Sequence, residues 1–139
     1  MIENNAKKER QQTCSFCSRR CEMAKYTKLL EFSPKERLKI KERDNYQCIF
    51  CQIGYKMPPA AVYEMEIQDI MHYIPRSKNG LGIEQNGAVG CRYHHHMLDN
   101  GNQGVRKEML QMFRDYLDVF YPDFPDTDRK YDKWRFLKV

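Results

Sequence analysis

The sequence predicts an α+β fold, a small zinc-stabilised domain with flanking helices. Its 139 residues fit one domain with an arm at either end. Helix-like and strand-like patterns alternate along it, and two pairs of Cys and His residues have the spacing of zinc ligands. We therefore expect a basic N-terminal arm over residues 1–32, a compact domain over 33–104, and a C-terminal helix with an extended tail over 105–139.

The N-terminal arm carries an excess of positive charge. Residues 1–43 hold twelve Lys/Arg and six Asp/Glu, an excess of +6, beside a formal charge of +5 for the whole chain. A basic arm in front of a near-neutral body is a common way to hold a polyanion such as nucleic acid. The alternative is that these charges only solvate a helix. Residues 1–13 are mostly polar, so we expect them to be disordered.

The arm also contains a cluster of three cysteines, Cys14, Cys17 and Cys21. Three thiolates are one ligand short of a closed tetrahedral zinc site. The sequence leaves open a second zinc site completed from elsewhere, a partial site, or a redox-sensitive pair.

The segment Ser33-Pro34-Lys35-Glu36 predicts the start of a helix. Ser33 can cap the helix, Pro34 suits its first turn, and Glu36 can close a capping box. We expect this helix to run to about Asp44, just before the next cysteine pair.

Two strands and a short helix follow. The pattern from Val62 to Ile74 predicts a strand that Pro75 ends, and residues 78–82 are rich in turn-forming residues. A second short strand is expected over residues 87–90, leading into Cys91. The segment from 94 to 98 fits a helix that Asn-Gly then ends.

A longer helix is predicted between residues 105 and 120 and is stopped by Pro122. Its apolar residues fall on one helical face, as expected for a packing surface: Val105, Met109, Met112, Phe113, Tyr116, Leu117 and Phe120. The tail from 123 to 139 is aromatic and charged, and we expect it to extend over the body.

The composition favours a reducing compartment. The N-terminus lacks the apolar core of a signal peptide, and no apolar run approaches the roughly 18–20 residues that span a bilayer. We therefore expect a cytoplasmic protein that associates with no membrane. Thiols stay reduced in the cytosol, so six cysteines favour metal binding over disulfides.

Two half-sites with matching spacing predict a structural zinc ion. They are Cys48-x2-Cys51 and Cys91-x2-His94. Each two-residue gap lets a knuckle turn point both ligands at one ion, and two knuckles complete a tetrahedron. Four protein ligands leave no open coordination position, so the zinc would be structural. The alternative, free buried cysteines with an exposed histidine, is much less consistent with this spacing.

Further polar residues surround the second knuckle. His95 and Asp99 are four residues apart and therefore share one face of the predicted helix. An imidazole and a carboxylate so placed can bind one divalent cation. His72 lies at the end of the first predicted strand, and Asn86 lies just before the second. His96 would point elsewhere, toward solvent or packing.

This arrangement over roughly residues 33–100 resembles the HNH endonuclease family. In that family a ββα-metal motif, here combined with a treble-clef-like pair of zinc knuckles, surrounds one ion. The resemblance rests on several motifs in register, namely a helix ending in Arg43-Asp44, Cys48-x2-Cys51, His72-x2-Pro75-Arg76-Ser77, Asn86 five residues before Cys91, and His95 directly after the second knuckle.

The resemblance implies a metal-dependent endonuclease that hydrolyses DNA phosphodiester bonds. It makes His72 the general base and gives Asn86 the role of fixing the loop and orienting His72. His95 and Asp99 would bind a catalytic cation, which could be Mg²⁺, Mn²⁺, Ni²⁺ or Zn²⁺. Two side chains of the loop after the first strand would contact phosphates, Arg76 and Lys78.

One position departs from the family pattern. The residue directly before the general base is usually Asp or His and binds the metal, but here it is Met71, a poor ligand for Mg²⁺ or Mn²⁺. Asp69 lies on the same face of a regular strand, about 7 Å further back. A β-bulge could bring it to the ion. Otherwise the ion has more water ligands, or the site is inactive.

Two other functions compete with the nuclease. One is a non-catalytic zinc-containing module that binds nucleic acid through the basic N-terminal region, which Met71 favours. The other is a structural or assembly protein that presents the 105–120 helix to a partner. For the nuclease, DNA is the expected partner. Cutting both strands would favour a homodimer or two sequential nicks.

Overall fold

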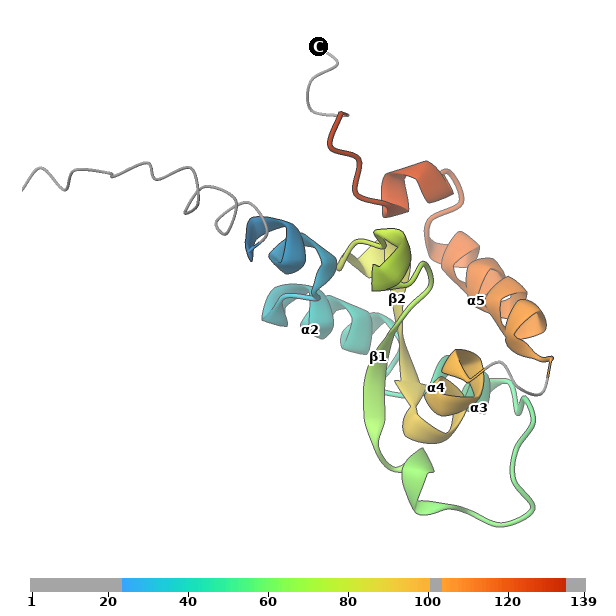
Figure 1. The fold of residues 1–139 in the computed structure, drawn as a ribbon. Coiled ribbons are helices and arrows are strands. Elements are labelled where there is room, and N and C mark those ends of the chain that lie inside the picture. The colour runs from blue at the N-terminus through green and yellow to red at the C-terminus, as the bar shows by residue number, and fades with distance from the viewer. Residues whose placement is uncertain (1–23, 101–103, 135–139) are drawn as a thin grey trace, which may run out of the picture.

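The computed structural model describes residues 24–100 and 104–134 (Figure 1). Two of the predictions for the N-terminal arm, disorder over residues 1–13 and the role of Cys14, Cys17 and Cys21, lie outside the described residues.

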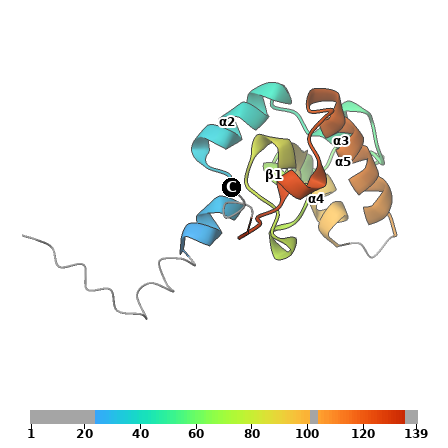
Figure 2. The same ribbon diagram turned by 90° about the horizontal axis from the view of Figure 1, so that it is seen from above.

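The described chain combines helices with one small sheet, which agrees with the predicted mixture of α and β structure. A helical stretch over residues 24–30 comes first. The elements that follow it are α2 (Pro34–Arg43), α3 (Ile49–Gln52), β1 (Gln68–His72), β2 (Gly87–Cys91), α4 (Arg92–Asp99) and α5 (Arg106–Phe120). Both views place the sheet between α2 on one side and α4 and α5 on the other (Figures 1 and 2).

Helix α2 begins as the sequence predicts. The Ser33 hydroxyl accepts a hydrogen bond from the backbone N–H of Glu36 at 3.2 Å, which satisfies one unpaired donor of the first turn. The reciprocal half of the predicted capping box does not form. Instead, the Glu36 carboxylate accepts from the backbone N–H of Glu84 at 2.8 Å. The N-terminus of α2 is thereby attached to the turn that precedes β2.

The first strand is shorter than predicted. Only Gln68–His72 pairs with β2, in a continuous antiparallel register from Gln68 opposite Cys91 to His72 opposite Gly87. Residues Tyr63–Met65 form a 3₁₀ turn instead. Because β2 passes directly into α4 at Arg92, the residues before Gln68 have no neighbouring strand with which to pair.

Strand β2 is the centre of the core. All five of its residues are buried, and they include two glycines and one alanine, so neighbouring elements approach it closely. On one side Val89 packs with Phe32 and Ile40. On the other side Ala88 lies in a core with side chains from both knuckles, β1, α4 and α5, among them Met71, Leu98, Met109 and Phe113.

Helix α5 confirms the predicted amphipathic helix. Met109, Phe113 and Leu117 are fully buried in the core that also contains the knuckle cysteines. Phe120, at its C-terminal end, is 44% exposed. The prediction of an extended tail is incomplete, because residues Asp126–Arg129 form a 3₁₀ turn.

A buried ion pair joins three elements. Arg43 and Asp44 form a salt bridge at 2.7 Å, with exposed side-chain fractions of 8% and 0%. The Asp44 carboxylate also accepts from the Val89 N–H at 2.8 Å and from the Tyr116 hydroxyl at 2.7 Å. The Arg43 guanidinium donates to the Gly87 carbonyl at 2.7 Å. The pair therefore connects α2 to β2 and α5.

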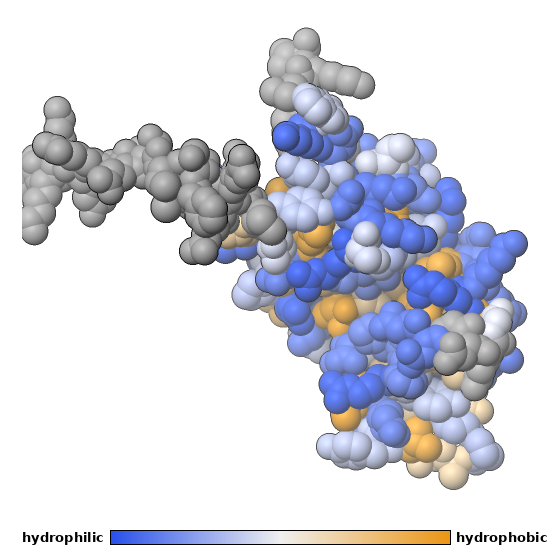
Figure 3. Space-filling view, in the orientation of Figure 1, coloured by the Kyte–Doolittle hydropathy of each residue, from blue (hydrophilic) through white to orange (hydrophobic). Residues whose placement is uncertain are grey.

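The surface seen in Figure 3 is mostly hydrophilic, with apolar patches separated by polar side chains. Within residues 24–100 and 104–134, no helix has the length and apolar character needed to cross a membrane.

Replacing Asp44 with alanine should leave the buried Arg43 guanidinium without its carboxylate. Removing one partner of a buried ion pair costs about 3–5 kcal/mol, because the remaining charge stays desolvated. We expect Asp44→Ala to lower the free energy of unfolding in urea by about that amount. The control is Glu42→Ala at an exposed position of α2, which should change it by less than about 0.5 kcal/mol. A loss of under about 1 kcal/mol for Asp44→Ala, typical of a surface pair, would contradict this role.

Candidate functional site

The two predicted knuckles meet in one cluster. The potential ligand atoms of Cys48, Cys51, Cys91 and His94 all lie within 4.8 Å of one another. Nδ1 of His94 is 3.2 Å from the Cys91 sulfur and 3.4 Å from the Cys51 sulfur. The first pair of ligands flanks the start of α3, and the second pair lies where β2 turns into α4. These four residues are positioned to hold a metal ion, and their donor set is compatible with structural zinc.

The orientation of His94 suits a metal ligand. Its Nε2 is 2.7 Å from the Tyr55 carbonyl oxygen. A carbonyl oxygen can only accept, so Nε2 carries the hydrogen and Nδ1 presents its lone pair to the three sulfurs. Such an outer hydrogen bond fixes the tautomer of a metal-binding histidine. Cys48, Cys91 and His94 are buried, so the cluster has little access for a substrate.

The thiols of the cluster differ in acidity. Burial raises the pKa of Cys48, but the interaction with the His94 ring and hydrogen bonds from the backbone N–H groups of Cys91 and Cys51 outweigh it and bring the pKa to about 7. Burial raises the pKa of Cys51 and that of Cys91 above the ordinary thiol value. A zinc ion binds thiolates, so metal binding here would release protons and weaken as the pH falls.

A second group of polar side chains converges on His95. Nδ1 of His95 is 3.2 Å from the Asp69 carboxylate of β1, and Nε2 is 3.1 Å from the Asp99 carboxylate of α4. The exposed side-chain fractions of His95, Asp69 and Asp99 are 30%, 25% and 61%. We call these three residues the His95 cluster. Unlike the buried Cys/His cluster, it is open to solvent.

Asp69 reaches His95 without the β-bulge that the sequence suggested. The register of β1 and β2 is continuous, with Asp69 opposite Gly90. Because α4 continues directly from β2, its first turn lies beside the Gln68 end of β1, and the Arg92 N–H donates to the Ile67 carbonyl at 2.8 Å. The helix therefore presents His95 to Asp69.

Met71 takes no part in the His95 cluster. Its side chain is 1% exposed and belongs to the apolar core. A methyl group added to Gly90 would overlap the Met71 side chain, so the thioether fills the space that this glycine leaves. The residue before His72 therefore packs in the apolar core.

The His95 cluster has the donor types of a cation site, but its donor atoms are not arranged around one point. His95 holds the two carboxylates on opposite ring nitrogens. Within the described residues, only the Cys/His cluster brings three or more ligand atoms within 4.8 Å of one another. Burial opposes ionisation of Asp69, but hydrogen bonds from His95 and Arg92 lower its pKa, so this carboxylate is charged at neutral pH. For one ion to bind the imidazole and both carboxylates, one carboxylate would have to rotate toward the ring nitrogen that the other carboxylate contacts.

His72 lies at the other end of β1 from Asp69. The two residues are three positions apart, so their side chains leave opposite faces of the strand. Nε2 of His72 is 2.8 Å from the Leu30 carbonyl oxygen, and the Phe32 ring packs on the imidazole at a centroid distance of 4.3 Å. Within the described residues, no hydrogen bond or ion pair joins His72 to the His95 cluster.

The imidazole of His72 is neutral at neutral pH. Burial is the largest influence and lowers its pKa. The Leu30 carbonyl raises the pKa, whereas electrostatic interactions, first with Arg76, lower it further.

Asn86 closes the loop between the strands. It is fully buried, and its side-chain oxygen accepts from the Ile74 N–H at 2.8 Å. Its amide nitrogen donates to the carbonyls of Ile74 and Leu81, at 3.1 and 2.8 Å. The Asn86 side chain thus joins both ends of the loop, and none of these bonds reaches the His72 imidazole.

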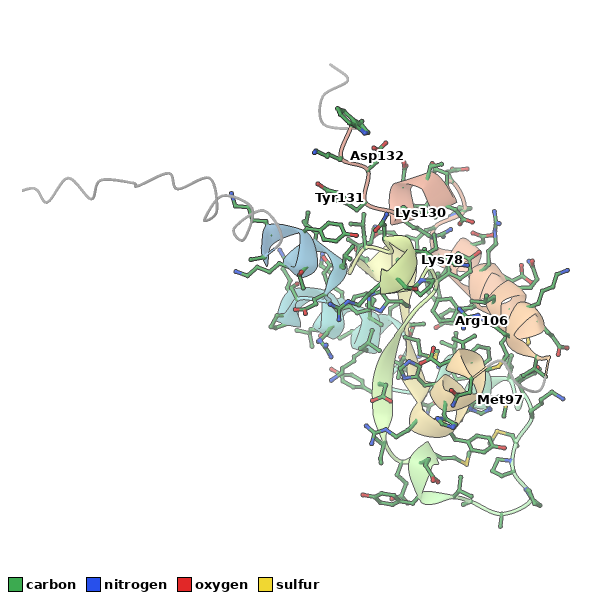
Figure 4. All side chains as sticks on the ribbon, viewed as in Figure 1. Lys78, Met97, Arg106, Lys130, Tyr131 and Asp132 are labelled. Atoms are coloured by element: carbon green, nitrogen blue, oxygen red, sulfur yellow. The ribbon has the colours of Figure 1, made fainter. Side chains whose placement is uncertain are left out.

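The two predicted phosphate contacts lie on this loop, and both are exposed. Arg76 pairs with Glu31 at 3.3 Å. Lys78 lies near Lys130 and Tyr131 of the C-terminal segment (Figure 4). That segment bonds to the loop, since the Leu81 N–H donates to the Arg129 carbonyl at 2.8 Å.

A hollow of about 660 Å³ lies on a different side of α4 from the His95 cluster. His96 lines it together with Tyr93 and Met97. His96 contacts the amide of Asn100, which agrees with the expectation that it points away from His95. Arg92 connects the hollow to the His95 cluster, because it lines the hollow and also pairs with Asp69 at 3.5 Å.

Sequence reasoning missed the residues that surround His72, Leu30 and Phe32. The contact from Leu30 uses its backbone carbonyl, which every residue has, so no side-chain pattern could have indicated it. Phe32 precedes the capping Ser33 and looks in the sequence like an ordinary apolar position before a helix.

His94→Ala should abolish metal binding in the Cys/His cluster, whereas His96→Ala should not. Both histidines lie on α4, but only His94 is buried among the sulfurs. We expect zinc in purified His94→Ala to fall by one ion per chain relative to the wild type. Cooperative thermal unfolding should also be lost, because structural zinc supplies roughly 10–16 kcal/mol in zinc-finger peptides. Metal analysis and circular dichroism test both points. If the zinc content of His94→Ala equals that of the wild type, His94 is not a ligand.

No family model, curated protein or solved structure matches this chain. A proposal about its function therefore depends on its own residues and their geometry.

Proposed function

We propose that this protein is a metal-dependent endonuclease of the HNH type that hydrolyses phosphodiester bonds in DNA. The observation that carries the proposal is the His95 cluster, in which carboxylates from β1 and α4 converge on one partly exposed imidazole. A structural zinc domain that only binds nucleic acid has no need for such an arrangement on a hairpin that also carries a second, neutral imidazole. Titratable groups gathered in this way commonly mark chemistry.

The donor set fits a divalent cation. One imidazole nitrogen and two carboxylate oxygens suit Mg²⁺, Mn²⁺, Ni²⁺ or Zn²⁺, with water completing the coordination. Asp69 would take the place of the strand ligand that Met71 does not provide. A cation held there would supply charge stabilisation at the scissile phosphate and at the departing oxygen.

His72 is suited to the role of general base. Its lowered pKa keeps the imidazole neutral near pH 7, so it can accept a proton from an attacking water. It is three residues from Asp69, or about 10 Å along the strand. A phosphate bound at the His95 cluster, with its attacking water, would have to span this separation. Arg76 and Lys78, on the adjacent loop, would hold the flanking phosphates.

The separation of His72 from the His95 cluster favours a second candidate. The imidazole packs on Phe32 and faces the Leu30 carbonyl, which is also what a histidine with a purely structural role would do. The protein would then be a non-catalytic zinc module that binds nucleic acid through its basic side chains. The two candidates differ in whether any metal supports cleavage.

The first test is cleavage of supercoiled plasmid by the full-length protein, with EDTA or with Mg²⁺, Mn²⁺ or Ni²⁺. We expect metal-dependent nicking that falls by about 10²–10⁴-fold in His72→Ala, the usual contribution of a general base. Asp69→Asn should raise the metal concentration needed for cleavage. The increase should be at least roughly 10–100-fold, which is the effect of changing a residue that only supports a ligand. His96→Ala is the matched control and should cut normally.

The outcomes separate the two candidates. Undiminished cutting by His72→Ala would show that another group is the base. No cutting with any metal, together with DNA binding that weakens as salt rises, would establish the binding module instead.

A measurement of DNA affinity tests the phosphate contacts of the loop after β1 separately from cleavage. Arg76→Ala should weaken binding by a similar factor on all sequences and reduce the slope of log affinity against log salt by about 1, because one phosphate contact is lost. Arg114→Ala provides the control, since this exposed arginine lies on α5 and pairs with Asp118 and Asp126. Fluorescence anisotropy across a salt series measures both variants. Equal salt slopes for Arg76→Ala and the wild type would remove Arg76 from the interface.

A further inference from the structure

The chain before α2 packs against the end of β1 and the loop that follows it. Residues 24–33 form this part, which we call the N-terminal strap. The Gly82 N–H of the loop donates to the Leu29 carbonyl of the strap at 2.9 Å. Arg76 of the loop pairs with Glu31 of the strap at 3.3 Å. These contacts place the strap over the predicted phosphate-binding loop.

The first residues of the strap also contact the loop and the C-terminal segment. The Tyr26 hydroxyl donates to the side-chain oxygen of Asn79, on the same loop. Its ring also packs edge-on against Tyr131, at a centroid distance of 4.9 Å. Tyr131 in turn donates its N–H to the Asn79 carbonyl at 2.8 Å. Asn79 is therefore held from both sides, and the strap has contacts with the loop along most of its length.

The strap makes one contact that determines the chemistry of His72. Nε2 of the imidazole is 2.8 Å from the Leu30 carbonyl oxygen. A carbonyl oxygen can only accept, so Nε2 must carry the hydrogen, and a neutral ring then has its lone pair on Nδ1. Within the described residues nothing hydrogen-bonds to Nδ1. The Phe32 ring, 6% exposed, packs on the imidazole and limits its rotation.

We propose that the N-terminal strap is a positioning element of the active site, in which the Leu30 carbonyl holds His72 as the Nε2–H tautomer so that Nδ1 accepts the proton from water. This inference rests on the proposed nuclease function. It assigns a specific role to a segment that the sequence marked only as part of a basic arm. The arm would then be required for the chemical step and not only for attraction of DNA.

The alternative is that the strap merely packs against the body. In that case displacing it would lower stability without changing which nitrogen of His72 carries the hydrogen. A positioning role predicts a different result. Without the Leu30 carbonyl the imidazole would exchange between its two tautomers and orientations, and only a fraction of the molecules would hold the base correctly.

Gly82 offers a way to displace the strap without altering any side chain of the site. Its backbone is not in the left-handed region, so alanine fits the local conformation. An added Cβ would, however, overlap the Glu31 carbonyl and lie 2.6 Å from the Phe32 nitrogen. The collision is with strap backbone next to Leu30, so the strap has to move. Gly104→Ala is the matched control, because its Cβ would meet nothing within 4 Å although its φ of +69° strains alanine.

The experiment combines cleavage kinetics with nitrogen NMR of the full-length zinc-loaded protein. In the wild type, long-range ¹H–¹⁵N spectra should show His72 with a protonated Nε2 and an unprotonated Nδ1; the signals are assigned by their loss in His72→Gln. In Gly82→Ala we expect averaged nitrogen shifts and a kcat about 10²-fold lower, the cost of a misplaced group, with KM unchanged. Gly104→Ala should retain the wild-type shifts and kcat.

Phe32→Leu gives a second, milder perturbation in case Gly82→Ala does not fold. It keeps an apolar side chain but removes the ring that packs on the imidazole, so we expect partial averaging of the same nitrogen shifts and a smaller fall in kcat. A protonated Nδ1 in the wild type, or wild-type shifts and kcat in both variants, would overturn the inference. Failure of the nuclease proposal is distinguishable, because the wild type itself would then not cut, and the nitrogen shifts alone would decide how the strap holds His72.

Discussion

The Cys/His cluster imposes a constraint on which the remaining architecture depends. Its second half-site lies where β2 becomes α4, and Cys91 is both the last residue of the strand and the N-cap of the helix. Bringing Cys91 and His94 to the same point as the first knuckle therefore fixes the angle at which α4 leaves the sheet. Because α4 carries His95 and Asp99, the position of the exposed cluster follows from that of the buried one. A core with so small a sheet depends on such a restraint.

The hairpin of β1 and β2 decides which strand residue meets the helix. With Gln68 opposite Cys91, the early end of β1 lies beside α4 and its late end lies beside α2 and the strap. Asp69 consequently contacts His95, whereas Met71 points into the core. Asp69 and Met71 lie on the same face of β1, so shifting this register by one residue would turn Asp69 away from α4 and Met71 out of the core together. The buried pair of Arg43 and Asp44 holds β2, the partner strand in this register, to α2 and α5.

The two ends of β1 thus provide different chemistry. At one end Asp69 and the α4 side chains form an acidic, solvent-accessible group with the donors of a cation site. At the other end His72 lies in a partly buried environment made by the N-terminal strap, where its pKa is lowered. The loop closed by Asn86 follows this second end and carries the basic side chains. A single hairpin therefore carries a group with the donor types of a cation site, a neutral imidazole and basic side chains.

The sequence by itself determined the features that depend on local spacing. Capping and periodicity located α2 and α5, and the Cys-x2-Cys and Cys-x2-His gaps identified the four residues that are positioned to hold a metal ion, because these patterns reflect the geometry of a single turn or helix face. The tertiary structure decided what depends on contacts between distant segments. The length of β1 was set by its short partner, and the proximity of Asp69 to His95 was set by the strand register. The surroundings of His72 came from the backbone carbonyl of Leu30, 42 residues away, and a backbone group common to every residue leaves no trace in a sequence.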